Sequence, residues 1–325
     1  MLWTLSKKIL FSLPPETSHA LALNALKFFS YFPFFKKKYS YPVTVMGIEF
    51  ENPIGLAAGL DKNGDYIDSL GQLGFGFLEI GTVTPRAQSG NPRPRLFRFP
   101  KQKVLINRMG FNNKGVDYLV ERLKRKKYSG VLGVNIGKNA DTPLEKAVDD
   151  YLECFNKVAA YAHYVTINIS SPNTKNLREL EKSEWLEALL RALKQQQKQF
   201  FETEKKYVPL IVKVSPDLSR HEAESMMRIF IQYEIDGVIA TNTTINHAEV
   251  SDEAGGMSGK LLSGQSGKIL NAFSMLQKNN QIPLIGCGGI FTKEDVEEKF
   301  KLGASLVQVY TGFIFQGPEM LTKLI

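Results

Sequence analysis

The segment Ile167–Thr174, Ile-Asn-Ile-Ser-Ser-Pro-Asn-Thr, begins as a strand and ends in a cluster of polar side chains. Apolar and polar residues alternate as far as Ser170, and the pair Ser171-Pro172 then ends the strand, because proline has no N–H for a strand ladder. Two asparagines, two serines and a threonine gather at this end. A strand does not need such a cluster to fold, whereas a pocket that binds a flat polar ring and moves a proton does.

Strand-like runs recur along the chain from residue 41 onward. Val43–Phe50 predicts a small hairpin, and helical segments such as Leu144–Tyr161 and Glu184–Phe201 alternate with later apolar runs. Two helix starts carry capping-box sequences, Ser219-x-x-Glu222 and Thr292-x-x-Asp295. The eight apolar runs are Gly55–Gly59, Phe77–Gly81, Val131–Ile136, Tyr164–Ile169, Leu210–Val214, Gly237–Ala240, Pro283–Gly286 and Leu306–Tyr310.

Eight strand–helix units predict an α/β fold of the closed (β/α)8 TIM-barrel type, which takes about 250 residues as one domain. An open, doubly wound sheet is the alternative, but no G-x-G-x-x-G follows the first strand. Two long segments interrupt the repeat. Thr84–Asn113 predicts a hairpin, with Pro94–Phe99 and Lys103–Ile106 on either side of a turn, and Asn246–Gly267 predicts a Gly- and Ser-rich loop. Loops of this length at a barrel mouth are usually functional lids.

Residues 1–40 are predicted to form an extension that precedes a barrel domain at 41–325. Leu2, Leu5 and Ile9 recur at helical spacing, and Pro14-Pro15 ends that helix and begins another. Neither apolar run approaches the roughly 20 residues of a membrane span, and Ile9–Leu13 is too short for a signal-peptide core. Six aromatic residues lie within Phe28–Phe35, beside three lysines at 36–38. This pattern favours two amphipathic helices on an anionic membrane surface, or equally a helical layer packed on the barrel.

The composition excludes several classes of function. The chain has 41 basic and 33 acidic residues, a net charge of +8, but no nucleic-acid-binding module accompanies it, so nucleic acid is not expected as a partner. The run at 124–127 is interpreted as solvated surface. Cys154 and Cys287 form no disulfide framework, which favours a reducing compartment, and the four histidines are scattered, so no metal site is predicted.

In a barrel of this type, the chemistry takes place at the carboxyl ends of the strands. Lysines, amides, hydroxyls and glycines dominate these ends, and acids other than Asp61 are nearly absent, which argues against glycoside hydrolysis. Gly288-Gly289 and Tyr310-Thr311 end the last two strands, where backbone N–H groups commonly bind phosphate. Together with Lys62 and Lys213, they indicate a phosphorylated cofactor and an anionic substrate.

Seven segments of the chain resemble the dihydroorotate dehydrogenase family. They are Leu56–Gly64 (LAAGLDKNG), Glu79–Pro85 (EIGTVTP), Asn107–Asn113 (NRMGFNN), Ile167–Thr174 (INISSPNT), Ala240–Thr244 (ATNTT), Gly286–Ile290 (GCGGI) and Leu306–Phe315 (LVQVYTGFIF). The resemblance extends over nearly the whole chain. It implies one FMN per chain and oxidation of dihydroorotate to orotate in pyrimidine synthesis.

Two features indicate the branch of the family. The quinone-reducing class has a serine base and an N-terminal helical extension, whereas the soluble class has a cysteine and no extension. Ser171 and residues 1–35 resemble the quinone class, in its bacterial form. The resemblance therefore implies ubiquinone or menaquinone as acceptor, peripheral attachment at the cytoplasmic face of the bacterial membrane, and a monomer.

The resemblance also assigns roles to single residues. Ser171 would take a proton from C5 of dihydroorotate while hydride leaves C6, Thr174 would relay that proton, and Lys62 would pair with the substrate carboxylate. Substrate contacts are further expected from Asn107, Arg108, Met109, Gly110, Phe111, Asn168, Asn173, Asn242 and Thr243. FMN contacts are expected from Ala57, Ala58, Gly59, Leu60, Asp61, Thr82, Asn135, Asn168, Lys213, Thr241, Gly259, Gly289, Tyr310 and Thr311. His19, Arg98 and Tyr310 correspond to polar positions of a quinone tunnel.

Three other hypotheses about the function remain open from the sequence alone. The first is a soluble-type dihydroorotate or pyrimidine oxidoreductase that uses fumarate or NAD. The second is a non-catalytic flavin-binding membrane protein, and the third is a colourless isomerase of phosphorylated sugars on the same barrel.

Overall fold

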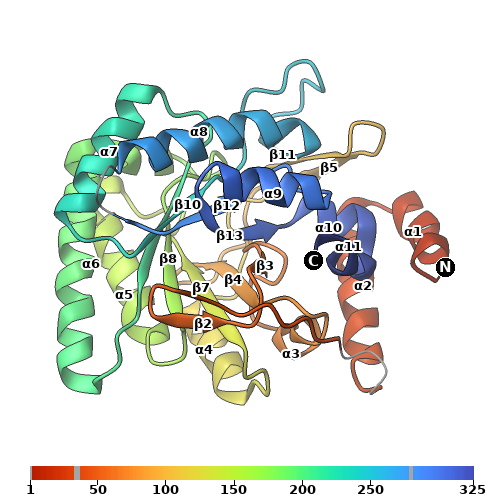
Figure 1. The fold of residues 1–325 in the computed structure, drawn as a ribbon, viewed down its shortest axis with the longest axis horizontal. Helices are drawn as coiled ribbons and strands as arrows, with labels where there is room; N and C mark the ends of the chain where they lie inside the picture. The colour runs from red at the N-terminus through yellow and green to blue at the C-terminus, as the bar shows by residue number, and fades with distance from the viewer. Residues whose placement is uncertain (1, 33–36, 278–280) are drawn as a thin grey trace.

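The predicted closed barrel is present in the computed structural model, which describes residues 2–32, 37–277 and 281–325 (Figure 1). Its eight parallel strands are β3 (Ile54–Leu56), β4 (Phe77–Val83), β7 (Val131–Ile136), β8 (Tyr164–Asn168), β9 (Leu210–Val214), β10 (Gly237–Ala240), β12 (Leu284–Cys287) and β13 (Ala304–Val309). β13 pairs with β3 and closes the barrel. All eight predicted runs are therefore confirmed as strands.

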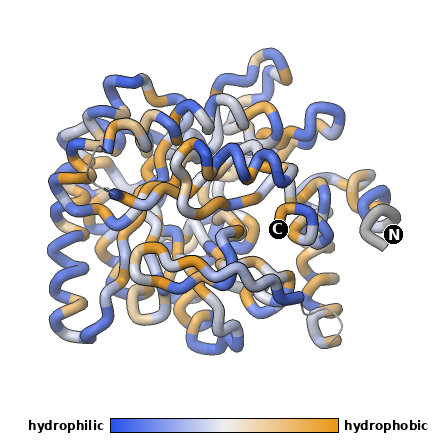
Figure 2. Tube along the Cα trace, viewed as in Figure 1, coloured by the Kyte–Doolittle hydropathy of each residue, from blue (hydrophilic) through white to orange (hydrophobic). Residues whose placement is uncertain are grey.

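Helices surround the barrel and cover its outer face. They are α3 (Ile67–Gly71), α4 (Val116–Arg125), α5 (Ala147–Val158), α6 (Ser183–Glu204), α7 (Arg220–Gln232), α8 (Ser263–Leu276), α9 (Lys293–Lys301), α10 (Thr311–Gln316) and α11 (Met320–Leu324). Both predicted capping boxes are formed, at Ser219 with Glu222 and at Thr292 with Asp295. Figure 2 shows hydrophilic residues along the outer edge of α6, as expected for a helix with one buried face.

The amino end of the barrel is plugged by aromatic side chains. β1 (Val43–Val45) and β2 (Ile48–Phe50) form the predicted hairpin, and Phe50 packs edge-on against Phe77, with 5.1 Å between ring centroids. Phe77 in turn packs against Tyr164. Because this end is filled, the carboxyl end is where a ligand can enter the barrel.

A three-stranded antiparallel sheet lies over the carboxyl end. β5 (Leu96–Phe99) and β6 (Val104–Asn107) form the hairpin predicted within Thr84–Asn113. β11 (Gly256–Gly259) pairs with β6, so the prediction of Asn246–Gly267 as an irregular loop is wrong in part. The segment also includes a 3-10 turn and the start of α8. A Gly-Met-Ser-Gly strand shows no alternation of its own, and its strand conformation depends on the ladder that β6 offers.

The N-terminal extension forms the two predicted helices, α1 (Leu2–Ser12) and α2 (Pro15–Phe29), at one side of the barrel (Figure 1). Phe11 of α1 packs edge-on against Phe315 of α10, with 5.4 Å between ring centroids, and α2 contacts β5 and α3. Phe28 and Tyr31 are 62% and 79% exposed. Residues 33–36, part of the predicted aromatic and lysine cluster, lie outside the described residues. Over the described ranges, we find no helix with the length and apolar character needed to cross a bilayer.

Ion pairs and hydrogen bonds fasten this extension to the β5–β6 hairpin. Glu16 of α2 accepts from Arg95 Nε at 3.0 Å and from Arg93 Nε at 3.1 Å. Arg98 Nη2 donates to the carbonyl oxygens of Phe11 and Leu13, both at 2.9 Å. The extension is therefore part of the wall around the barrel mouth.

Candidate active site

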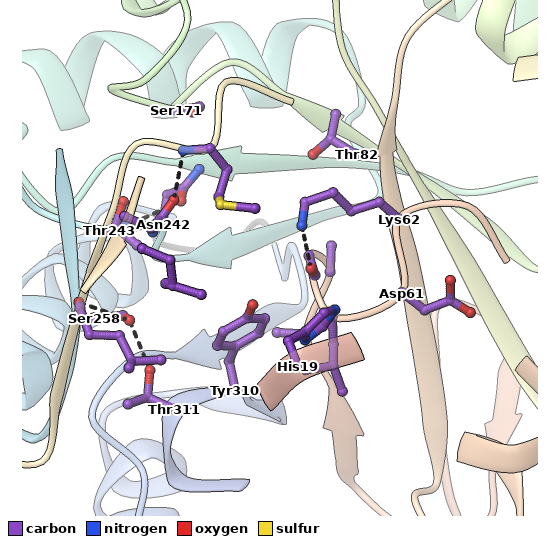
Figure 3. Close-up of a pocket in the computed structure, with 18 of the residues that line it drawn as sticks. His19, Asp61, Lys62, Thr82, Ser171, Asn242, Thr243, Ser258, Tyr310 and Thr311 are labelled. Carbon is purple, nitrogen blue, oxygen red and sulfur yellow. Dashed lines mark hydrogen bonds between the residues drawn. The ribbon is translucent and has the colours of Figure 1, made fainter. Parts of the chain in front are cut away.

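A cavity of about 620 Å³ opens at the carboxyl end of the barrel, between the strand ends, the three-stranded sheet and α2. Most residues that the sequence nominated border it (Figure 3). They are His19, Ala57, Ala58, Gly59, Leu60, Asp61, Lys62, Thr82, Asn107, Met109, Gly110, Phe111, Asn168, Ser171, Asn173, Lys213, Thr241, Asn242, Thr243, Gly259, Gly289, Tyr310 and Thr311.

Four nominated residues lie behind this lining. Asn135 is fully buried, and its Nδ2 donates to Glu79 Oε1 at 2.8 Å. Arg108 pairs with Glu253 at 2.7 Å, and Arg98 binds the α1–α2 connection. Thr174 is buried, and its hydroxyl oxygen has no hydrogen-bond partner among the described residues.

Amide side chains from separate strands form a network on one side of the cavity. Asn242 Nδ2 donates to Asn168 Oδ1 at 3.2 Å, and Asn173 Nδ2 donates to Asn107 Oδ1 at 3.3 Å. The buried Ser171 lies at the same end, where its Oγ accepts the N–H of Asn173 at 3.3 Å. This arrangement offers donors and acceptors to a flat ring beside a hydroxyl that could exchange a proton.

Lys62 supplies positive charge to the same region. Its Nζ donates to the carbonyl oxygen of Gly59 at 2.8 Å. Burial, together with the nearby charge of Arg95, lowers the pKa of Lys62 to about 8. A bound carboxylate would favour the charged form again, because an opposite charge stabilises a desolvated ammonium.

Asp61 directly precedes Lys62 in the chain, but its carboxylate points away from the cavity (Figure 3). Its oxygens accept the backbone N–H of Asp65 at 3.0 Å and of Tyr66 at 2.7 Å. The side chain therefore holds the β3–α3 turn.

The opposite side of the cavity is rich in glycine and fits a flavin phosphate. Gly288 and Gly289 have φ values of +110° and +81°, and a Cβ on Gly289 would lie 2.3 Å from the Cα of Ser263.

Lys213 projects from β9 into the cavity lining. The buried Gln308 Oε1 also has no hydrogen-bond partner within the described ranges, so the lining offers a free acceptor as well as a cation.

Two polar residues were not identified as site residues from the sequence: Gln308, which lines the cavity, and Glu79, which lies beneath it. Glu79 accepts from Gln308 Nε2 at 2.7 Å and from the Tyr164 hydroxyl at 3.1 Å, besides Asn135. The sequence did carry a signal for them: Glu79 lies within the apolar run of β4 and Gln308 within that of β13. Polar side chains in a barrel core are hydrogen-bonded, so such residues indicate a buried polar network.

His19 of α2 and Tyr310 after β13 line the cavity on the side of the extension (Figure 3). Burial, with the charge of Lys62, lowers the pKa of His19 to about 4, so its imidazole is neutral at pH 7. Burial raises the pKa of Tyr310 to about 12. His19 and Tyr310 thus present uncharged polar groups here, beside the charged side chains of Glu16, Lys62 and Arg93.

Comparison with known proteins identifies the family. A profile described as "Dihydroorotate dehydrogenase" matches residues 40–325. The chain belongs to the dihydroorotate dehydrogenase family. It is similar to proteins named "Dihydroorotate dehydrogenase (quinone)" from Acinetobacter baylyi, at 52% identity over 331 residues, and from Idiomarina loihiensis, at 52% over 333 residues. Each alignment covers 100% of this chain and 99% of the relative.

The dihydroorotate dehydrogenase fold is also found among solved structures. One is described as "Crystal structure of DHODH in complex with ferulenol from Eimeria tenella". It has a TM-score of 0.87 and 35% sequence identity, covering 97% of this chain and 92% of that one. The similarity therefore includes the N-terminal extension as well as the barrel.

Proposed function

We propose that the chain oxidises dihydroorotate to orotate with a bound FMN and passes the electrons to a membrane quinone, in pyrimidine biosynthesis. The names of its relatives support this assignment. The observation that carries it is the convergence of Ser171, Lys62 and four asparagines on one cavity that α2 also borders. A serine at the base position, together with helices before the barrel, favours the quinone class over an enzyme that uses fumarate or NAD.

Ser171 would accept the proton from C5 of dihydroorotate. An unassisted serine is a weak base, so the proton needs an onward path. The buried, unpartnered hydroxyl of Thr174 supports a relay through that residue and a water. Lys62 would pair with the substrate carboxylate, and Asn107, Asn168, Asn173 and Asn242 would orient the ring, with Thr243 and the segment 108–111 completing the contacts.

FMN, when bound, supplies the two-electron acceptance that removes hydrogen from C6. Lys213 would lie beside its ring, where a fixed cation favours added negative charge. The segment Ala57–Asp61, Thr82, Thr241 and Gly259 would surround the ring and ribityl chain, and Gly289, Tyr310 and Thr311 the phosphate. Asn135 would support this shell from behind, because its Oδ1 accepts from the Thr82 hydroxyl at 2.5 Å. The cavity at the barrel mouth supports the expectation of one FMN per chain.

Residues 1–40 would form a membrane-docking unit and 41–325 the catalytic domain. The exposed aromatic residues of the extension support peripheral attachment, at the cytoplasmic face of a bacterial membrane. His19, Arg98 and Tyr310 would line the route of ubiquinone or menaquinone. We expect the chain to act as a monomer.

An anaerobic absorbance experiment tests the proposed function. The purified protein should be yellow, bleach with dihydroorotate, and recover its colour with a quinone but not with fumarate or NAD. The Ser171→Ala variant should keep its flavin but bleach roughly a hundredfold more slowly or worse, the usual loss for a proton-transfer group. If the wild type is yellow but never bleaches, only the hypothesis of a flavin-binding protein remains. If it stays colourless even with added FMN, neither the oxidoreductase nor the flavin-binding hypothesis holds.

A further inference from the structure

Lys299 of α9 is buried behind the glycine turn that borders the cavity. Only 2% of its surface is exposed. Its Nζ donates to Ser266 Oγ at 2.6 Å and approaches the carbonyl oxygen of Ser263 at 3.5 Å. Ser266 Oγ in turn lies 3.0 Å from the carbonyl oxygen of Gly288 and 3.1 Å from that of Ser263, and its one proton is shared between these two acceptors. One hydroxyl group therefore separates this ammonium from the turn.

The surrounding chain leaves room for the lysine stem. A Cβ on Gly286 would lie 3.1 Å from the Cβ of Lys299, and one on Gly267 would lie 3.9 Å from its Nζ. Gly286 belongs to β12 and Gly267 to α8. Two elements thus carry glycine where the lysine passes between them.

No acidic side chain neutralises this lysine directly. Across residues 2–32, 37–277 and 281–325, no carboxylate oxygen lies within 4.0 Å of its Nζ. Asp295 of the same helix is engaged by Lys260 at 2.7 Å. Burial lowers the pKa of Lys299 to about 8. A buried cation without a counter-charge is unfavourable, so an anion in the adjacent cavity would offset its cost.

We propose that Lys299 is a positioning residue that makes the site select a phosphorylated flavin over one without phosphate. It acts through Ser266 and the Gly288–Gly289 turn and does not itself touch the cofactor. The 3-10 turn Lys260–Leu262 runs directly into α8, and neither has a side-chain cap at its start, so the first N–H groups of this combined helix add to the positive potential near the turn. The inference rests on the proposed binding of FMN.

The test compares two flavins on the full-length protein. After the bound flavin is removed, FMN and riboflavin are titrated separately into wild type and the Lys299→Met variant, and binding is followed by flavin fluorescence. The ratio of the two affinities should fall by about tenfold to a hundredfold in the variant, as expected for charges one side-chain layer apart at an effective dielectric constant of about 20. Riboflavin affinity should stay near the wild-type value.

Lys138→Met is the matched control. Lys138 is also buried, but its Nζ donates to the carbonyl oxygens of Asn139 and Thr142 and not to the turn. Its loss can weaken the fold, but it should leave the FMN-to-riboflavin ratio unchanged. If Lys299→Met does not fold, Lys299→Gln removes the charge while keeping a donor for Ser266, and the same fall is expected.

The outcomes separate this inference from the proposed function. A wild type that binds neither flavin contradicts the proposed function itself. A wild type that prefers FMN, with a Lys299 variant that prefers it equally, overturns the inference alone. An equal loss of both affinities in the variant also overturns it, because a purely structural role would weaken both flavins alike.

Discussion

Arg178 Nη1 donates to Asp217 Oδ2 at 2.8 Å, and this ion pair joins two loops of the active site. The same guanidinium donates from Nε to the carbonyl oxygen of Ser170 at 3.2 Å and from Nη2 to that of Thr243 at 3.0 Å. One planar group thus fixes the residue before Ser171 relative to the end of β10. The rigid fork of an arginine suits this task, because its donors have a set geometry.

The Arg178→Met variant should reduce its flavin with dihydroorotate roughly tenfold to a hundredfold more slowly, since small displacements of a reacting group cost rate on this scale. FMN content should be unchanged, because no cofactor contact is removed. Stopped-flow bleaching measures the rate. Arg191→Met is the control, since Arg191 contacts the Tyr233 hydroxyl at the surface. Equal rates in both variants would show that the pair does not position Ser171.

Binding of the anionic product should weaken at high pH. The pKa of Lys62 in the free protein is about 8, so its ammonium loses its proton as the pH rises through that value. If Lys62 pairs with the carboxylate, the affinity for orotate should be flat below about pH 7 and fall toward tenfold per pH unit above pH 8.

The dissociation constant of orotate can be followed from pH 6 to 9.5 by the change in flavin absorbance. Lys62→Met should bind orotate weakly and with no such pH dependence. A wild-type affinity that stays constant up to pH 9.5 would exclude Lys62 as the partner of the carboxylate.

His19 should affect only the second half of the reaction. The His19→Phe variant should be bleached by dihydroorotate at a rate close to that of wild type, but its KM for quinone should rise roughly fivefold, the loss expected for one hydrogen bond. Steady-state assays with varied quinone measure this change. His221→Phe, at an exposed position on α7, serves as the control. An unchanged quinone KM would remove His19 from the quinone route.

The exposed aromatic residues of the extension should contribute to membrane binding. Replacing Phe28 and Tyr31 by serine should weaken binding to vesicles that contain anionic lipid by roughly tenfold, since apolar area is lost from the docking face. Co-sedimentation measures the affinity. Serine at Phe201, in the last turns of α6, and at Tyr207, which follows α6 and packs against Phe201, is the matched control, since both side chains are exposed. Similar binding by both double variants would place the docking face elsewhere.

The sequence predicted what local pattern determines. Buried parallel strands appear in the sequence as apolar runs, and the polar residues at their ends indicated the site. The barrel and most of the cavity lining could therefore be predicted. The part that depends on distant partners could not be predicted. β11 is a strand because β6 pairs with it, and the direction of the Asp61 carboxylate is set by backbone N–H groups in its own turn.

The contact of Arg178 with two loops and the burial of Lys299 were hidden for the same reason. Each is a charged residue in a segment whose pattern is typical of a solvated surface. Only the packing of elements far apart in the chain turns such residues inward.

The ion pair between Glu16 and Arg95 joins α2 to the segment before β5, so the extension and the barrel mouth share one wall of the cavity. Arg95 also donates to the carbonyl oxygens of Ser89 and Asn91, and Asn91 Nδ2 donates to the carbonyl oxygen of Asn173 at 3.1 Å. Residues 89–91 thus form a strap between Arg95 and the loop after β8. A molecule wedged beneath α2 would therefore strain the strap around the substrate. By thermodynamic linkage, orotate would change the affinity of that wedge by the same factor. Inhibitors that bind beneath α2 should therefore be ranked with orotate bound, because their potency would depend on both ligands.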